Sequence, residues 1–409
     1  MTEARSIGTR IKSRRWRTSN RRPPAVLFVP ALIVAALSLV PVCYLLYREG
    51  VNFDRLRRLL KSPTTGPLIE HSALLVVCVT SACVVLGVAL AMLVARTDLP
   101  GRRVWTVLFT LPLGIPAFVT SYTWVAAGYR YAPKSTFIYG LRGSVIILTL
   151  SLFPYVYLPT VAALRGLDAS QEEAARALGR GPLAAFFAVT APQLQRAVSG
   201  GALIIALHML AEYGALELLR YRTLTTAIVQ RATVLGSPEA ARALSLVLTV
   251  VALLVLAADQ LLLRRRLAPI RTGGGVPRPA APWRLGMMTP VALLVSALLV
   301  ALSLGVPLFF MVDGLRSEAI DWRPLIDAAA YTAQYAAETG VVVALAALPI
   351  AMLAVRHASA PVRLIERATW VAHSLPGVVV SLSLVYFAVR WVRPLYQTSW
   401  LLVFGYAIL

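Results

Sequence analysis

Residues 144–164 read S-V-I-I-L-T-L-S-L-F-P-Y-V-Y-L-P-T-V-A-A-L, an apolar run without a single charged side chain. At a helical rise of about 1.5 Å per residue, such a run crosses the roughly 30 Å hydrocarbon core of a bilayer. The runs Ala25 to Tyr47 and Val291 to Val312 have the same character. Lipid offers no partner to backbone polar groups, so we expect these runs to form membrane-spanning helices.

The composition of the whole chain agrees with this expectation. The 409 residues are 58% hydrophobic and 14% charged, whereas a soluble domain is about 45–50% apolar and about 25% charged. We therefore predict an all-α polytopic membrane protein with about ten transmembrane helices. The predicted spans are 25–47, 68–96, 104–127, 144–164, 198–218, 241–263, 287–312, 330–355, 368–390 and 399–409.

The formal charge of +22 follows the pattern of membrane topology. Basic residues lie between the apolar runs, which argues against a nucleic-acid partner and for a lipid bilayer. The basic segment 1–24 predicts a cytoplasmic N-terminus, because cytoplasmic segments are enriched in Lys and Arg. The first run is too long for a cleaved signal peptide, so we expect a multi-pass protein of the plasma (inner) membrane. Because successive spans alternate in direction, the loop 165–197 is expected on the cytoplasmic side. The same alternation puts the stretch 48–61 on the outer side of the membrane, although this stretch is basic.

An internal repeat divides the chain. L-G-V-A-L-A-M-L-V-A-R at 86–96 is echoed by A-A-L-P-I-A-M-L-A-V-R at 346–356, and Leu111-Pro112 by Leu375-Pro376. An even number of spans separates the copies, which predicts two parallel permease-like repeats, 25–263 and 287–409. The Gly- and Pro-rich basic segment 264–286 reads as a cytoplasmic linker between them. The second repeat is incomplete, which fits a fragment, a truncation, or a split protein completed by a second polypeptide.

The loop 165–197 carries the strongest local signals. Ser170 with Glu173 three residues later predicts a capping box, so that a helix starts at Gln171. Gly179 predicts a left-handed helix stop, and Gly181-Pro182 the start of a second helix. That second helix is expected to end near Ala191, before Pro192. The residues alone leave two interpretations open: an ordinary capped surface helix pair, or a docking element for another protein.

A resemblance favours the second interpretation. Glu173-Ala174-Ala175, Gly179 and Val189-x-x-Pro192 resemble the E-A-A-x-x-x-G-x(9)-I-x-L-P loop of binding-protein-dependent ABC permeases. Val189 replaces the usual Ile, and Ala191 the usual Leu. The resemblance implies that this loop docks on a dimer of ATPase subunits, and that a solute-binding protein delivers the substrate from outside. The implied coupling residues are Glu173, Ala174, Ala175, Gly179, Val189 and Pro192.

Two further segments indicate a subfamily. L-P-L-G-I-P-A-F-V-T-S-Y-T-W (111–124) and A-E-Y-G-A-L-E-L-L-R-Y-R-T-L-T-T-A-I (211–228) are similar to segments of fused two-half permeases of the ferric-iron type. That similarity implies ferric iron as the leading substrate. Thiamine, polyamines or an oxyanion stay open as alternatives, because one fold serves many substrates.

Polar residues and prolines inside spans are candidates for the translocation path. His208 and Glu212 lie one helical turn apart in one span, either on the path or in a local pair. Pro112, Pro116 and Pro376 are expected to break their spans, and broken helices either line a cavity or serve packing. Tyr122 follows Pro112 and Pro116 in the same segment and completes the set.

No motif for catalysis stands out. The chain lacks the phosphate-binding G-x-x-x-x-G-K-[ST] pattern, so any ATP must be bound by a partner subunit and no cofactor is expected here. No metal site is expected either. The three cysteines, Cys43, Cys78 and Cys83, lie in apolar runs and are read as packing residues. The alternatives from other classes are a membrane enzyme, a carrier that does not use ATP, and an inactive fragment.

Overall fold

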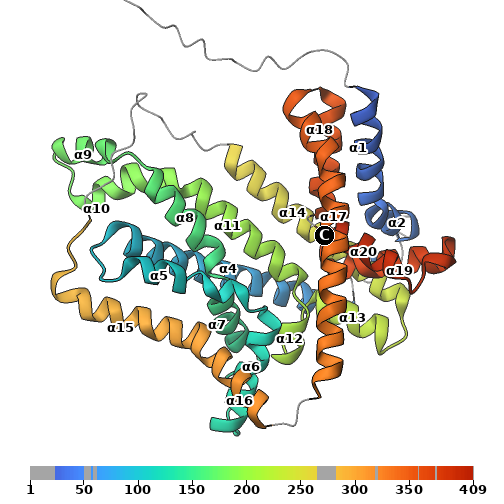
Figure 1. Cartoon of the computed structure of the whole chain (residues 1–409), viewed down its shortest axis with the longest axis horizontal. Coiled ribbons are helices and arrows are strands. Elements are labelled where there is room, and N and C mark those ends of the chain that lie inside the picture. The colour runs from blue at the N-terminus through green and yellow to red at the C-terminus, as the bar shows by residue number, and fades with distance from the viewer. Residues whose placement is uncertain are drawn as a thin grey trace, which may run out of the picture.

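The computed structural model describes residues 24–49, 57–58, 62–264, 282–317, 321–357, 359–373 and 375–408. Across these residues the chain is built from helices joined by short loops (Figure 1). Residues 1–23 of the predicted N-terminal segment and residues 265–281 of the predicted linker lie outside the described residues.

The elements before the linker are α1 (Ala25–Ser38), α2 (Val40–Glu49), α4 (Thr65–Arg96), α5 (Arg102–Leu108), η1 (Leu111–Gly114), α6 (Ala117–Tyr131), α7 (Gly140–Leu152), α8 (Pro154–Gly166), α9 (Ala169–Ala177), α10 (Pro182–Ala185), η2 (Phe186–Thr190), α11 (Ala191–Ala211), α12 (Gly214–Leu218), α13 (Leu224–Thr233) and α14 (Pro238–Arg264). Those after it are η3 (Gly286–Met288), α15 (Thr289–Val300), η4 (Ala301–Gly305), α16 (Val306–Ser317), α17 (Trp322–Arg356), α18 (Ala360–His373), α19 (Gly377–Trp391), η5 (Arg393–Leu395) and α20 (Ser399–Ile408).

The number of spans differs from the prediction of about ten. Among the described residues, six helices are long and apolar enough to cross a membrane, or eight if two bent pairs each count as one span. The run predicted at 368–390 is divided between the end of α18 and the 15-residue helix α19, and the run 399–409 forms the 10-residue helix α20. The chain is thus an all-helical polytopic membrane protein with six to eight candidate spans.

Proline explains both bends. The predicted span 25–47 bends by 44° between α1 and α2, where Pro41 removes a backbone donor and its ring conflicts with the preceding turn. The span predicted at 104–127 bends by 92° between η1 and α6. There Ile115 is extended (φ −106°, ψ 117°), as a residue before proline tends to be, and Pro116 caps α6. The predicted break at Pro112 and Pro116 is confirmed.

The largest hydrophobic cluster lies where α4, α7, α8 and α11 pack together. It contains the fully buried side chains of Leu75, Phe153 and Tyr157. Glycine permits the closest approaches between these helices: a Cβ built on Gly87 would lie 3.0 Å from the backbone of Tyr157, and one on Gly201 2.4 Å from the carbonyl of Tyr155. Small residues at such crossings let helix backbones come together without side chains between them.

Helices α6 and α19 match in detail although 260 positions separate them. Both have 15 residues, begin after a proline cap (Pro116 and Pro376) and carry an arginine in the last turn. Their C-caps also agree: Ala132 has φ −143° and ψ 59°, and Val392 has φ −138° and ψ 59°. The local structure therefore recurs at the spacing of the sequence repeat.

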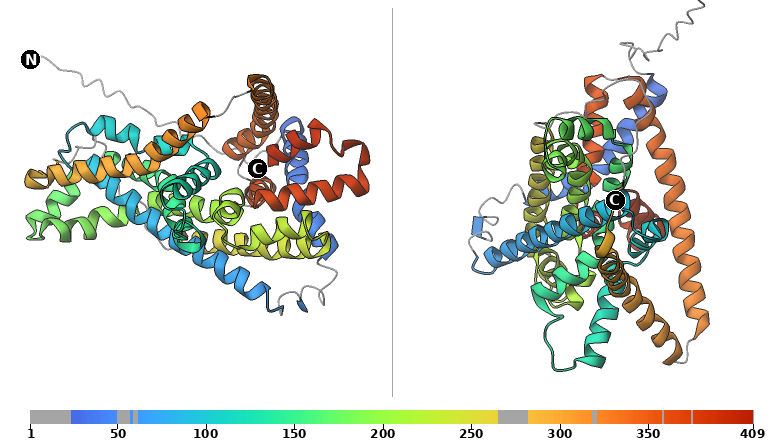
Figure 2. Two further views of the ribbon diagram at one scale, coloured as in Figure 1. Left: turned by 90° about the horizontal axis from the view of Figure 1, so that it is seen from below. Right: turned by 90° about the vertical axis from the view of Figure 1, so that its left-hand side faces the viewer.

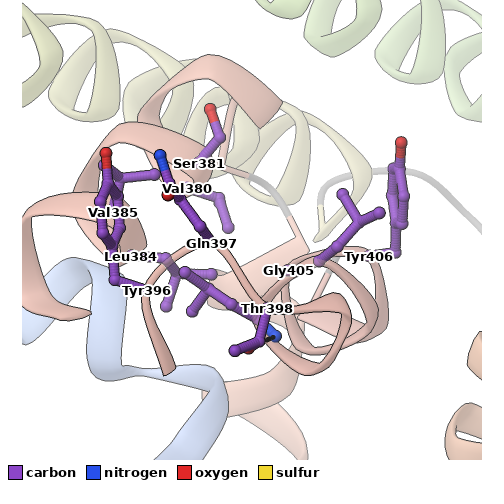
Figure 3. A pocket seen from close by; sticks show the side chains of 11 residues that line it. Val380, Ser381, Leu384, Val385, Tyr396, Gln397, Thr398, Gly405 and Tyr406 are labelled. Atoms are coloured by element: carbon purple, nitrogen blue, oxygen red, sulfur yellow. Dashed lines mark hydrogen bonds between the residues drawn. The ribbon is translucent and has the colours of Figure 1, made fainter. Parts of the chain in front are cut away.

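The second half of the chain is more open than the first. Only 6% of the most apolar window of α17 is buried, and Figure 2 shows this helix at the margin of the molecule. A mostly apolar cavity of about 340 Å³ lies between α19 and α20, lined among others by Leu384, Tyr396 and Leu401 (Figure 3). In the first half, α6 packs against both α7 and α12.

Candidate coupling site

The loop 165–197 projects from one end of the helices α8 and α11 (Figure 1). Its first helix, α9, starts at Ala169 and not at Gln171, so the predicted capping box at Ser170 is wrong. Asp168 is the cap: its backbone is extended (φ −84°, ψ 120°), and its carboxylate accepts from the Ser170 amide at 3.1 Å. Aspartate caps helices as well as serine does, and here the Asp168 side chain makes the capping bond.

The glycine stop is confirmed. Gly179 is left-handed (φ +88°). Its amide donates to the Arg176 carbonyl at 3.0 Å, and the Arg180 amide donates to the Ala175 carbonyl at 3.2 Å. This pair of bonds is the Schellman arrangement, which satisfies the last carbonyls of a helix. The chain therefore reverses at Gly179 in a fixed geometry.

The second helix starts at Pro182 as predicted but does not end before Pro192. α10 leads through the π-helical segment η2 directly into α11, and Pro192 is the second residue of α11. In η2 the Ala191 amide bonds to the Phe186 carbonyl, five residues back, which adjusts the backbone just before a residue with no N–H of its own. The span predicted at 198–218 consequently runs over Phe186–Ala211.

The outward side of the loop is apolar at two points. Glu173, Ala174 and Pro192 are exposed, while Ala175 and Val189 are half-buried. Next to them, Leu178 is 86% exposed and Phe187 68%. Aromatic side chains are enriched at protein interfaces, so the exposed Phe187 makes this side of the loop a candidate docking surface. Sequence reasoning missed Leu178, although an apolar residue directly before a helix stop on a polar loop is a readable signal.

The inward side of the loop is polar and buried, which sequence reasoning also missed. The Glu172 carboxylate is buried, and its Oε2 lies 3.0 Å from the Arg96 guanidinium at the end of α4. Thr190 Oγ1 donates to the same oxygen at 2.9 Å. Gln193 Nε2 donates to Gln171 Oε1 and to the Val189 carbonyl, both at 3.0 Å. These bonds fasten α9 to η2, α11 and α4.

The corrected cap can be tested directly. We expect Asp168→Ala to destabilise α9 by about 1 kcal/mol, because the Ser170 amide loses its acceptor. Ser170→Ala serves as the matched control and leaves α9 unchanged, since Ser170 lies inside the helix. Hydrogen exchange of the amides of 171–177 measures both. Faster exchange in the Ser170 variant with none in the Asp168 variant would restore the capping box at Ser170.

The candidates for the translocation path fall into three places. Pro112, Pro116 and Tyr122 share the broken span, where Pro112 is buried and Tyr122 is 59% exposed on α6. Pro376 caps α19 in the second half. Two further acids lie in predicted spans. Glu338 accepts a hydrogen bond from Gln334 at 2.8 Å, and Asp259 lines a cavity of about 450 Å³ with Gln195 and Ser199.

His208 and Glu212 meet at the far end of α11. His208 Nε2 lies 3.6 Å from Glu212 Oε2, and Glu212 Oε1 accepts from the Ala215 amide at 2.9 Å. Glu212 therefore holds the first turn of α12.

The described residues define a multi-span helical membrane protein with a helix–turn–helix loop at one end. Residues 84–268 match the family described as binding-protein-dependent transport system inner membrane component. The chain is also 33% identical over 397 residues to the Fe(3+)-transport system permease protein FbpB 2 of Haemophilus influenzae, covering 95% of this chain and 77% of that protein. The chain belongs to the binding-protein-dependent ABC transporter permeases.

Other relatives match shorter parts. The molybdenum transport system permease protein ModB of Mycobacterium tuberculosis is 30% identical over 249 residues, which are 57% of this chain and 92% of that protein. The putative 2-aminoethylphosphonate transport system permease protein PhnU of Salmonella typhimurium is 26% identical over 216 residues, 48% of this chain and 75% of that protein.

Family membership decides several points left open by the residues. The protein is a non-catalytic, multi-pass component of an inner-membrane ABC importer, and the family carries no cofactor. ATP is bound by an ATPase partner, and a solute-binding protein is the second partner that the family's description implies. Among the described residues no group of three or more His, Cys, Asp or Glu side chains could hold a metal ion.

Proposed function

We propose that this permease moves ferric iron from a solute-binding protein into the cytoplasm. The observation that carries the proposal is the similarity to the Fe(3+)-transport permease, which extends over 95% of the chain and thus over both halves. The similarity to the molybdenum permease covers 57%. An importer for thiamine, polyamines or an oxyanion on the same fold is the alternative.

The loop 165–197 is the contact with the ATPase in this proposal. Glu173, Ala174, Ala175 and Gly179 form its docking turn, and the exposed Leu178 and Phe187 support this role because they offer apolar area to a partner. Val189 and Pro192 belong to the helix that leads away from the turn. The loop and the N-terminus are cytoplasmic, and two ATPase copies act on the complete transporter.

The continuity of α10, η2 and α11 supports a route for the ATP-driven movement. A displacement of the docking turn is passed along this unbroken helix to Glu212, which holds α12. α12 in turn packs on α6: a Cβ built on Gly214 would lie 2.9 Å from the ring of Phe118. The movement thus reaches the helix that follows the break at Pro112 and Pro116. We place the translocation path there, beside Tyr122, His208 and Glu212, with Pro376 as the counterpart in a second parallel repeat (287–409).

The matching geometry of α6 and α19 supports the division into two repeats, 25–263 and 287–409. In both, a long helix that ends at an arginine, Arg96 or Arg356, is followed, after intervening helical segments, by a proline-capped helix of 15 residues. Two copies of one unit in the same orientation would present equivalent faces to a two-fold ATPase dimer.

Substrate identity is tested by uptake. Cells lacking the gene are expected to lose uptake of radioactive ferric iron that the intact gene restores, at iron concentrations low enough to require the solute-binding protein. Molybdate and thiamine uptake, measured in the same cells, are expected to stay unchanged. Unchanged iron uptake together with lost thiamine or molybdate uptake would contradict the proposal and select the alternative.

A further inference from the structure

Two adjacent glutamates in the loop have opposite surroundings. Glu173, the residue of the family motif, is exposed, whereas Glu172 is only 7% exposed. A buried carboxylate is costly without charged or hydrogen-bonding partners. Glu172 has both, because Arg96 and Thr190 contact the same carboxylate oxygen. The two neighbours can therefore do different things: one faces a partner protein and the other faces the permease.

Arg96 brings three separate elements together through its side chain. It is the last residue of α4 and only 4% exposed. Its guanidinium reaches Glu172 in α9, and Glu172 in turn accepts from Thr190 in η2. The junction formed by Arg96, Glu172 and Thr190 thus joins the end of a membrane span to both helices of the loop. Thr190 lies in the π-helical segment, a rare local geometry that is frequent at functional positions.

The backbone of Arg96 makes a second connection, to the start of the second half. The Trp283 amide donates to the Arg96 carbonyl at 2.7 Å, and the Asp98 amide donates to the Trp283 carbonyl at 3.1 Å. The Leu285 amide adds a bond to the Asp98 carboxylate at 2.8 Å. The Trp283 ring lies edge-on to Phe186, with centroids 6.3 Å apart. The end of the segment predicted as a flexible linker is thus bound beside the junction.

The chemistry of the junction argues for more than fold stability. A buried ion pair contributes little net stability compared with well-packed apolar residues, yet removing one partner leaves an uncompensated charge. Such a pair fixes one arrangement of the groups it joins. Here it fixes α9, which carries the docking turn, relative to α4 and to the first residues of the second half.

We propose that Arg96 and Glu172 are positioning residues that transmit the movement of the docking turn to α4 and, through Trp283, to the second half. This inference rests on the proposed role of the loop 165–197. The ATPase binds the outward side of α9. When α9 moves, the buried ion pair between Glu172 and Arg96 transmits the movement to α4. Breaking the pair leaves the ATPase bound but separates ATP hydrolysis from transport.

The test uses the complete transporter, with its ATPase and solute-binding protein, in proteoliposomes. In Arg96→Gln and Glu172→Gln we expect the ATPase to co-purify and basal hydrolysis to persist. Stimulation by the loaded binding protein and transport per folded complex should each fall about tenfold, a typical size for coupling between sites. The exchanged pair Arg96→Glu with Glu172→Arg should regain most of both. Arg103→Gln, on the exposed side of α5, is the matched control and should behave as the wild type.

Four outcomes overturn the inference: single variants that stimulate and transport normally, loss of transport only in proportion to lost folded complex, no recovery in the exchanged pair, or loss of the bound ATPase from the single variants. Glu173→Lys separates this result from a failure of the proposed loop function, because it should release the ATPase. If Glu173→Lys retains the ATPase and transports normally, the loop role itself fails.

Discussion

Replacing Gly179 with tryptophan is expected to remove the ATPase from the permease and to stop transport. Gly179 adopts φ +88°, which any other residue adopts only at a cost of about 1 kcal/mol. A Cβ there meets no atom within 4 Å, so the indole would project from the docking turn into the space of the partner. The strain lowers the stability of the fold, whereas loss of a central contact weakens association itself by about 2 kcal/mol, which is roughly thirtyfold.

Gly236 offers a matched control for this experiment. It is also left-handed, with φ +57°, and a Cβ there meets nothing within 4 Å. It lies between α13 and α14, away from α9 in Figure 1. Gly236→Trp should therefore carry similar backbone strain and retain the ATPase. Co-purification of the ATPase with each variant measures the difference. Equal loss in both variants would assign the effect to folding, and full retention by the Gly179 variant would contradict the docking role.

The second large effect concerns two neighbouring glycines in α11. In Gly201→Ala the new Cβ would lie 2.4 Å from the Tyr155 carbonyl oxygen and 2.8 Å from Val156 Cα. These are backbone atoms of α8, so α11 and α8 must separate, and overpacking of this kind costs about 3 kcal/mol. Gly200→Ala meets nothing within 4 Å and should gain about 0.5–1 kcal/mol from helix propensity.

Thermal unfolding of the two purified variants in detergent separates these cases. The unfolding midpoint should fall for Gly201→Ala and rise slightly for Gly200→Ala. Midpoints that move together, in either direction, would mean that α8 and α11 do not approach as closely as the structure has them.

The parts of the fold that depend on local chemistry could be predicted from the sequence. Long apolar runs predicted most of the candidate spans but also counted the shorter helices α19 and α20 as spans. Pro112 and Pro116 predicted the break and Gly179 the turn, because each effect acts within a few residues. Where two local signals compete, the pattern does not decide: Asp168 and Ser170 are both good caps. Pro192 predicted a helix end, but the helix continues through it. The π-helical turn just before Pro192 bonds the Ala191 amide to the Phe186 carbonyl, which adjusts the backbone to a residue without an N–H.

The interior of the site could not be predicted in the same way. Arg96 and Glu172 stand 76 positions apart, and only the packing of α4 against the loop brings them together. Glu172 and Glu173 look alike in the sequence, yet one is buried and the other exposed. Trp283 pairs with Arg96 although its neighbourhood is rich in Gly, Pro and Arg, which favours a free linker. Such contacts are set by tertiary structure.

Cross-linking from Ala174 tests the central claim most directly. Ala174 is exposed on α9, and replacement of the three free cysteines, Cys43, Cys78 and Cys83, allows a single cysteine to be introduced there. With the ATPase and a short thiol cross-linker, Ala174→Cys is expected to form an adduct with the ATPase, which ATP should alter. Val234→Cys, 74% exposed after α13, should form none. Absence of an ATPase adduct at Ala174 in an assembled, transporting complex would contradict the account.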